Sequence, residues 1–223
     1  MRFLELLDKG IAAGTRLIGG TSTKYRADGN EVRLDPTSEM FDKDEVIGTK
    51  VLVCSLHDRF DELLKGDAEI YRHQYPATVT NSFAGIPDLM DALTNKYDVV
   101  HLFCDVNSRG EIIDNIGNKI TGTQLIQRCG EQNVKLLWIA NDNQPDGYIA
   151  DFKPQENRLN LVMTIDRNGP KFRDFLRKLL FQMFSGKRMP VAWVDLCPQH
   201  EGPNQADMPS CIFAALRETV RLR

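Results

Sequence analysis

The stretch YDVVHLFCDVNSRGEIIDNIGNKITGTQLIQRCGEQNVKLLWIAN, residues 97–141, holds the two most apolar strand-length runs of the chain, at 99–104 and 134–140. Strands buried on both faces of a parallel sheet are apolar along their whole length, so each run predicts such a strand. Between the two runs, residues 110–121 predict a hairpin and residues 124–132 predict a helix. This order of elements is typical of an α/β fold.

The same alternation of strands and helices continues outward from this stretch in both directions. Further strands are predicted at 51–56, 77–80, 161–165 and 191–195, and further helices at 60–70, 86–93 and 171–184. Pro87 fits the first turn of its helix, where a proline removes no hydrogen bond. We therefore predict a three-layer α/β/α sandwich with a mostly parallel central sheet, formed by residues 46–223.

Residues 1–45 differ in character and predict an N-terminal helix followed by a polar arm, packed on the domain or extending from it. Apolar residues recur at roughly helical spacing within 1–20. In the arm, a turn-forming sequence at 27–30 separates Tyr25 from the run 32–34, which predicts the two arms of a hairpin. Near the other end of the chain, residues 198–209 predict a surface loop that leads to a last helix.

Composition and charge exclude several classes of protein. Of the 223 residues, 42% are hydrophobic and 26% are charged, which is typical of a globular domain. The formal net charge is −3 and the isoelectric point is about 5.8, so nucleic acid is an unlikely direct ligand. The sequence has no apolar run of membrane-spanning length, no signal-peptide pattern and no CxxC among its five cysteines. These features predict a cytoplasmic protein with reduced thiols and no membrane segment.

Polar side chains follow the predicted strands at their carboxyl ends, which is where open parallel sheets bind ligands. The candidate binding residues are His57, Asp58, Asp105, Asn107, Asn141, Asp142 and Asp166. The same residue types are favoured in turns and as helix caps, so a purely structural role fits most of them as well. The sequence contains neither a phosphate-binding glycine motif after a strand nor a GxSxG nucleophile motif.

In order and length of its elements, the chain resembles the CHAT domain, a branch of the caspase-like cysteine peptidases, over roughly residues 46–200. Residues 97–105 match the family's strand of the form H-apolar-small-G-H-G, whose second His is catalytic. Residues 110–121 resemble its hairpin, 121–125 its helix entry, and 138–141 its strand ending in A-C, where the Cys is the nucleophile. The helix 171–184 with the following Ser185 and Gly186 is similar to the family's F…L..G helix.

The two catalytic positions of the family are substituted in this chain. Asp105 stands at the His position and Asn141 at the Cys position, although a Cys–His peptidase needs a thiolate and an imidazole within hydrogen-bond reach. His101 lies in the same predicted strand and is expected to be a packed histidine. We therefore expect no catalytic residues and no cofactor, and instead a CHAT-like pseudo-peptidase that binds a partner protein or ligand. The resemblance implies a partner on a separate chain and a regulatory role in prokaryotic defence or cell death.

One alternative is an enzyme of phosphoryl or nucleotide chemistry that holds Mg²⁺ or Mn²⁺. The strand-end carboxylates Asp105 and Asp142, with Asp166 as a further candidate, are the kind of ligand that these hard cations prefer. The sequence places no basic cluster beside them, and the nearest cations are Arg109 and Lys119. A weaker alternative is a cysteine hydrolase that pairs Cys104 or Cys197 with His57 or His200.

Overall fold

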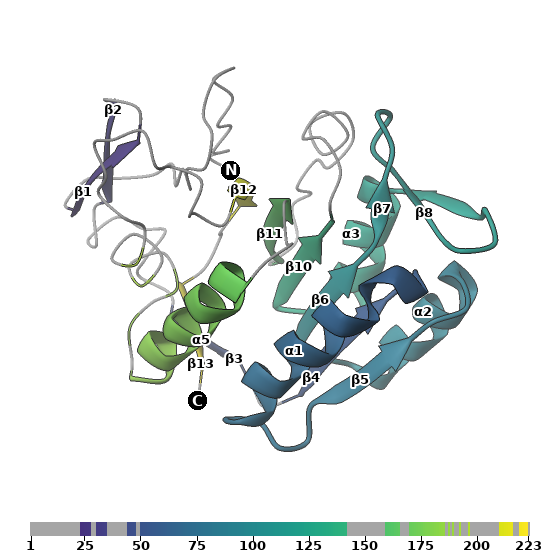
Figure 1. The fold of residues 1–223 in the computed structure, drawn as a ribbon, viewed down its shortest axis with the longest axis horizontal. Coiled ribbons are helices and arrows are strands. Elements are labelled where there is room, and N and C mark those ends of the chain that lie inside the picture. Colours follow the sequence, from purple (N-terminus) through teal and green to yellow (C-terminus); the bar gives the residue numbers. More distant parts are fainter. Residues whose placement is uncertain are drawn as a thin grey trace.

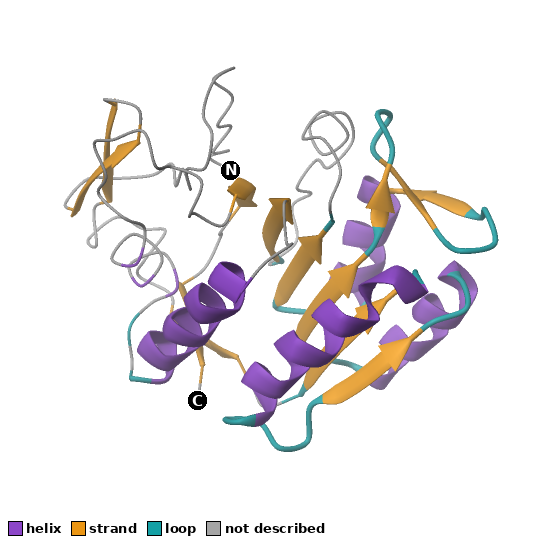
Figure 2. Ribbon diagram, in the orientation of Figure 1, coloured by secondary structure: helices purple, strands orange, loops and turns teal. Residues whose placement is uncertain are grey.

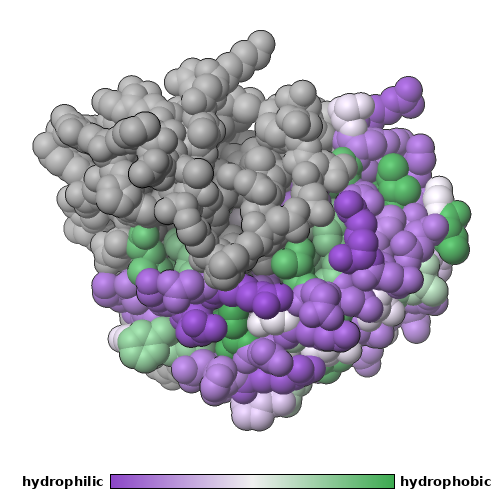
Figure 3. Space-filling view, in the orientation of Figure 1, coloured by the Kyte–Doolittle hydropathy of each residue, from purple (hydrophilic) through white to green (hydrophobic). Residues whose placement is uncertain are grey.

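The computed structural model describes residues 23–27, 30–34, 44–47, 50–141, 159–165, 170–185, 187, 189, 192, 196, 210–215 and 219–222. Figure 1 shows these elements and labels them in chain order. No helix within the described ranges is long and apolar enough to cross a membrane. On the face drawn in Figure 3, the described surface is mostly hydrophilic, with hydrophobic side chains scattered over it.

The core of the fold is one mixed sheet. Its strands are β4 (Val51–Ser55), β5 (Val79–Ser82), β6 (Val99–Phe103), β10 (Leu136–Ala140), β11 (Asn160–Ile165) and β12 (Ser210–Ala215). They lie in the order β12-β11-β10-β6-β4-β5, and every pair is parallel except β11 with β12. The predicted mostly parallel α/β sheet is therefore confirmed.

Helices cover both faces of this sheet (Figure 2). They are α1 (Asp61–Arg72), preceded by the short η1 (Asp58–Phe60), then α2 (Ile86–Ala92) continued by η2 (Leu93–Asn95), α3 (Gly122–Glu131) and α5 (Pro170–Phe184). Two buried clusters follow from alternate strand residues. Val53 and Trp138 pack with α1 and α5, whereas Leu52 and Leu137 pack with α2 and α3. Burial of both faces explains why these strands are apolar throughout.

The strand order reverses at β4. The chain leaves β4 through α1 to reach β5 on one side, and then passes through α2 to reach β6 on the other side. In doubly wound sheets such a reversal opens a crevice outside the carboxyl ends of the two strands, and ligands bind there. A ligand-binding site is therefore expected at the carboxyl ends of β4 and β6.

A small antiparallel sheet extends from the carboxyl end of β6. It consists of β7 (Asp105–Val106), β8 (Glu111–Ile113) and β9 (Lys119–Thr121) in the order β7-β8-β9, and we refer to residues 105–121 as the hairpin. It confirms the hairpin predicted for this stretch. Helix α3 starts directly after it, because Thr121 and Gln124 form a capping box that satisfies backbone donors at the helix start.

The structure corrects the predicted end of the chain. The strand predicted at 191–195 is wrong at Ala192, the residue of this run that the structure describes, because Ala192 is helical, as are Met189 and Leu196. These three residues are spaced like one face of a helix and all contact the same core cluster. The predicted last helix is also wrong, since the chain forms β12 and then β13 (Thr219–Leu222), which pairs with β3 (Asp44–Ile47).

Smaller differences concern the outer elements. The strand predicted at 77–80 lies two residues later, as β5, and is an exposed edge strand with a weak apolar signal. The predicted polar hairpin is confirmed, because β1 (Thr23–Ala27) pairs with β2 (Asn30–Leu34) and Tyr25 lies opposite Val32. The helix predicted within 1–20 and the loop predicted at 198–209 lie outside the described residues.

Candidate functional site

His57 and Asp105 meet at the reversal of strand order. Ser55 of β4 lies opposite Phe103 of β6 in the parallel register, so the residues two positions further along the two strands also lie side by side. The His57 Nε2 atom is 3.2 Å from Asp105 Oδ2, and the two side chains are 13% and 25% exposed. Two of the predicted site residues are thus brought together by strand pairing alone.

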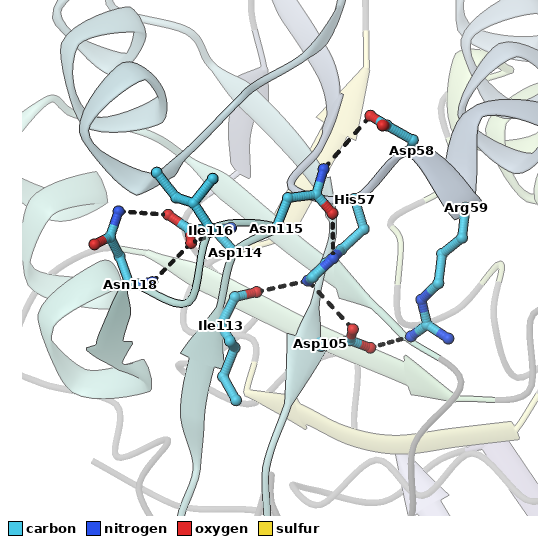
Figure 4. A network of polar contacts seen from close by, with 9 residues as sticks. All are labelled: His57, Asp58, Arg59, Asp105, Ile113, Asp114, Asn115, Ile116 and Asn118. Atoms are coloured by element: carbon cyan, nitrogen blue, oxygen red, sulfur yellow. Dashed lines mark hydrogen bonds and ion pairs between the residues drawn. The ribbon is translucent and has the colours of Figure 1, made fainter.

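His57 also contacts the hairpin through both of its ring nitrogens (Figure 4). Its Nε2 atom lies 2.8 Å from the backbone carbonyl oxygen of Ile113, and its Nδ1 atom lies 2.7 Å from Asn115 Oδ1. The Asn115 amide in turn donates to Asp58 Oδ1 at 3.5 Å. One imidazole therefore joins the loop after β4, the start of β7 and the far turn of the hairpin.

Arg59 completes this group, and the sequence analysis missed it. Its guanidinium donates to Asp105 Oδ1 and lies over the Phe60 ring at 4.5 Å from the ring centroid. The expectation that Arg109 and Lys119 are the cations nearest to the strand-end aspartates is wrong, because the loop after β4 supplies a closer one. We call His57, Asp58, Arg59, Asp105 and Asn115 the His57 network.

The far turn of the hairpin is also anchored to α2, through the buried carboxylate of Asp114. This carboxylate accepts hydrogen bonds from the backbone amides of Ile86 at 2.8 Å, Ile116 at 3.1 Å and Asn118 at 2.8 Å, and from Asn118 Nδ2 at 3.0 Å. Burial alone raises the pKa of Asp114, but these hydrogen bonds outweigh it and lower the pKa below its usual value. A Cβ atom on Gly85 would lie 2.9 Å from Asp114 Oδ2, so a larger residue there would force this hydrogen-bonded carboxylate to shift.

The other predicted site residues lie elsewhere or outside the described residues. Asn107 is a turn residue, because its Oδ1 accepts from the backbone amides of Arg109 at 2.9 Å and Glu111 at 3.0 Å. Asn141 is fully buried at the end of β10, where its backbone amide donates to the Thr164 carbonyl at 3.1 Å. Both fit the structural role that the sequence left open. The described residues do not include Asp142 and Asp166.

The described thiols are unsuited to nucleophilic catalysis. Cys104, one of the candidate nucleophiles, is fully buried, and burial raises the pKa of its thiol well above the ordinary value. Burial likewise raises the pKa of Cys54, and that of Cys129 to about 12. A cysteine nucleophile needs a thiolate and access to substrate, and these three have neither. Cys197 and His200, the remaining candidates, lie outside the described residues.

The contacts of Asp105 disfavour a metal ligand at this position. Arg59 contacts one of its carboxylate oxygens and His57 the other, so a divalent cation would have to displace both. Within the part of the chain that the structure describes, no three His, Cys, Asp or Glu side chains are grouped so that they could hold a metal ion. The partner proposed for Asp105 in the metal alternative, Asp142, lies outside the described residues.

A second histidine–aspartate pair lies in the core beneath this edge of the sheet. His101 Nε2 is 3.5 Å from Asp67 Oδ2, and both side chains are 0% exposed. The imidazole stacks against the rings of Phe103 and Trp138, with centroids 5.0 and 5.2 Å away, and the Tyr71 hydroxyl lies 3.4 Å from its Nδ1. The prediction that His101 is a packed histidine is confirmed, and it takes no part in the His57 network.

Comparison of the chain with models of known protein families gives no match, and comparison with curated proteins gives none either.

Proposed function

We propose that this chain is a CHAT-like module without peptidase activity, which binds a partner protein or ligand at the carboxyl edge of its sheet. One observation carries the proposal. Asp105 stands where the family has its catalytic histidine, and its two carboxylate oxygens are engaged by Arg59 and His57. The position is occupied by an ion-paired network rather than by a base beside a nucleophile.

The order of elements supports the resemblance on which the proposal rests. Strand β6 is followed by the β7-β8-β9 hairpin, by α3 and then by β10, which is parallel to β6. This is the succession of strand, hairpin, helix and strand that the sequence resemblance implies. Asp105 and Asn141 follow the ends of these two neighbouring strands.

The local chemistry argues against hydrolysis by the family mechanism. Asn141 supplies an amide in place of a thiol, and the thiol of Cys104, which follows β6, is buried with a raised pKa. His57 cannot replace the missing base without breaking its present contacts, because both of its nitrogens face protein oxygens. A general base must be able to reach the substrate's proton, so this histidine serves as a structural connection.

The biological part of the proposal comes from the resemblance. CHAT domains are often joined to sensor or partner modules in bacterial conflict and cell-death systems, so a separate protein chain is the proposed partner. The proposed setting is cytoplasmic and the proposed role is regulatory, with no cofactor.

The test compares binding and hydrolysis on the same protein. Peptides are selected from a displayed random library on the wild-type chain, and the affinity of the selected peptides is measured by calorimetry. Asp105→Ala combined with Arg59→Ala is expected to weaken binding at least tenfold while the fold, followed by circular dichroism, is retained, because both side chains are reached by solvent at this edge. Asp88→Ala, on the exposed face of α2, is the control and should bind normally.

Two results would count against the proposal. Cleavage of the selected peptides, together with rapid labelling of a thiol by iodoacetamide at neutral pH, would indicate a cysteine hydrolase. An increase in melting temperature of about 5–10 °C with millimolar Mg²⁺ or Mn²⁺, lost in Asp105→Ala, would instead favour the metal-dependent enzyme.

A further inference from the structure

We infer that the open edge of β5 pairs with the β5 strand of a second copy of this chain, so that two central sheets join across a two-fold axis. β5 is the last strand of the sheet, and its neighbour in the sheet is β4. Figure 1 shows it at the outer border of the sheet, at the opposite end from β12. The inference concerns this lateral edge and does not depend on the function proposed for the carboxyl edge.

The direction of each backbone group in β5 follows from its pairing with β4. The Phe83 amide donates to the Ser55 carbonyl at 2.9 Å, so residue 83 faces β4. Backbone groups alternate in direction along a strand, so Asn81 also faces β4, whereas Thr80 and Ser82 face the open edge. The amides and carbonyls of these two outward residues form no hydrogen bond among the described residues. They are a template on which another strand can pair.

β5 lacks several features that keep edge strands from pairing. Edge strands are commonly protected by lysine, by proline, by a bulge, or by a segment that covers them. The sequence of β5, VTNS, contains neither a charge nor a proline, and its register with β4 runs without a shift. Val79, Asn81 and Ser82 are exposed, Val79 by 40%. The strand is short, but both of its outward residues are accessible to a partner.

A second copy fits this edge because the two outward residues are placed symmetrically about Asn81. In antiparallel pairing, two residues of a hydrogen-bonded pair exchange both of their bonds. Thr80 opposite the partner's Ser82, and Ser82 opposite the partner's Thr80, would use all of the outward amides and carbonyls. Two-fold symmetry, in which one surface meets the same surface of its copy, is the commonest arrangement of homodimers.

The side chains at the centre of this register also suit self-pairing. Asn81 would lie opposite its own copy, and an amide group both donates and accepts, so the two copies can hydrogen-bond each other. A two-fold axis brings like residues together, which destabilises a charged strand but not a neutral one. Asn81 shares a face with its register partner Cys54, on the side of α2. Val79 lies on the same face, and pairing would remove part of its exposed apolar surface from water.

Arg72 weakens this pairing. Its guanidinium donates to Thr80 Oγ1 from the end of α1, on the other face of the strand. The two-fold axis brings this group and its copy to the same face of the joined sheet, where they repel each other. Salt screens repulsion between exposed charges, so the dimer should be at least as strong at about 0.5 M salt as at about 0.15 M. Association through opposite charges would show the reverse dependence.

Sedimentation equilibrium of the full chain tests the inference, and the central place of Asn81 allows a charge-exchange experiment. Asn81→Lys and Asn81→Asp each bring two like charges together at the axis, so each alone should weaken the dimer about tenfold. An equimolar mixture of the two variants should restore pairing as a heterodimer. Gln127→Lys, at an exposed amide on α3, is the control and should dimerise like wild type.

Thr80→Pro tests the backbone itself. It removes an amide that faces the open edge and leaves the pairing with β4 intact, which is the placement in which edge strands tolerate proline. By symmetry two hydrogen bonds are lost in each dimer, so association should weaken at least tenfold. Thr80→Val keeps the amide and loses only the contact with Arg72, and it should still dimerise.

Residue-resolved hydrogen exchange identifies the edge that is used. The Thr80 and Ser82 amides should exchange more slowly as the dimer forms, while the Phe83 amide, already bound to β4, should not change. A chain that stays monomeric up to about 1 mM would overturn the inference, as would weakening by salt or a dimer that persists in both Asn81 variants. Protection of Thr80 and Ser82 only after a library-selected peptide is added would assign the edge to a strand of another protein and also overturn it.

Discussion

The described part of the chain contains two histidine–aspartate pairs, one at the carboxyl edge of the sheet and one between the sheet and α1, and they differ in their access to water. His57 and Asp105 lie at the edge, with side chains 13% and 25% exposed. His101 and Asp67 lie in the core, both 0% exposed. The edge pair is partly exposed to solvent, and its histidine connects three separate segments. The core pair is enclosed by aromatic rings, so any change in it disturbs the packing of α1 on the sheet.

The comparison shows that the pairing of residue types does not determine their role. The same imidazole and carboxylate connect separate surface segments where solvent reaches them, and join a helix to the sheet where it does not. The variants below are ordered by the expected loss of stability, from the core pair to the edge pair.

Asp67→Ala is expected to have the largest effect. It removes the buried carboxylate beside His101 and should lower the free energy of unfolding by about 3 kcal/mol, because a buried polar partner is lost without replacement. For a chain of this size that corresponds to a fall in melting temperature of roughly 6–12 °C, measured by circular dichroism. Glu69→Ala, on the exposed face of the same helix, should change the melting temperature little.

A double variant tests whether His101 and Asp67 interact energetically. Asp67→Leu combined with His101→Leu replaces both polar groups by apolar ones and should be less destabilised than the sum of the two single variants. If the losses in free energy of unfolding were strictly additive, the two side chains would not interact energetically. Their proximity would then result only from the packing of α1 on the sheet.

Asp114→Ala should have an intermediate effect, about 2 kcal/mol at pH near 6, because four hydrogen bonds end on this buried carboxylate. The pKa of Asp114 is lower in the folded chain than in the unfolded one. Its contribution is therefore fully present above the unfolded value of about 3.9 and is lost as the pH falls through the folded value. Urea unfolding at several pH values should show the difference between wild type and variant shrinking in acid, whereas a constant difference would rule out this role.

Arg59→Ala should have the smallest effect on stability, at most about 1 kcal/mol, since its side chain is 48% exposed and water screens its pairing with Asp105. Arg109→Ala, in the exposed turn of the hairpin, is the matched control. If Arg59→Ala alone lowered the free energy of unfolding by more than about 2 kcal/mol, the contacts of the edge pair would contribute about as much to stability as those of the core pair.

Much of the fold could be predicted from the sequence, because strands buried on both faces must be apolar along their length. The runs at 51–56 and 99–104 led directly to β4 and β6. The same rule gave a wrong prediction at Ala192, which is helical and packs in the core cluster that also holds residues of α1 and α5. Periodicity over five residues cannot separate the two cases.

The site was only partly predictable. His57 and Asp105 could be paired because both follow the ends of neighbouring parallel strands. Arg59 and Asn115 were missed because their roles depend on contacts between the loop after β4 and the hairpin. Hydrophobic periodicity in the sequence predicts helices and strands, but it does not predict contacts between two loops. The polar type of Asn115 was visible, but in a turn it carries little information by itself.

The aromatic stack of His101 between Phe103 and Trp138 has an optical consequence. The chain has two tryptophans, and Trp138 is fully buried with its ring nearly parallel to the imidazole, at an interplanar angle of 10°. In a Trp193→Phe background, the fluorescence of Trp138 would therefore report whether this stack, and with it the packing of α1 on the sheet, is intact, with no added label.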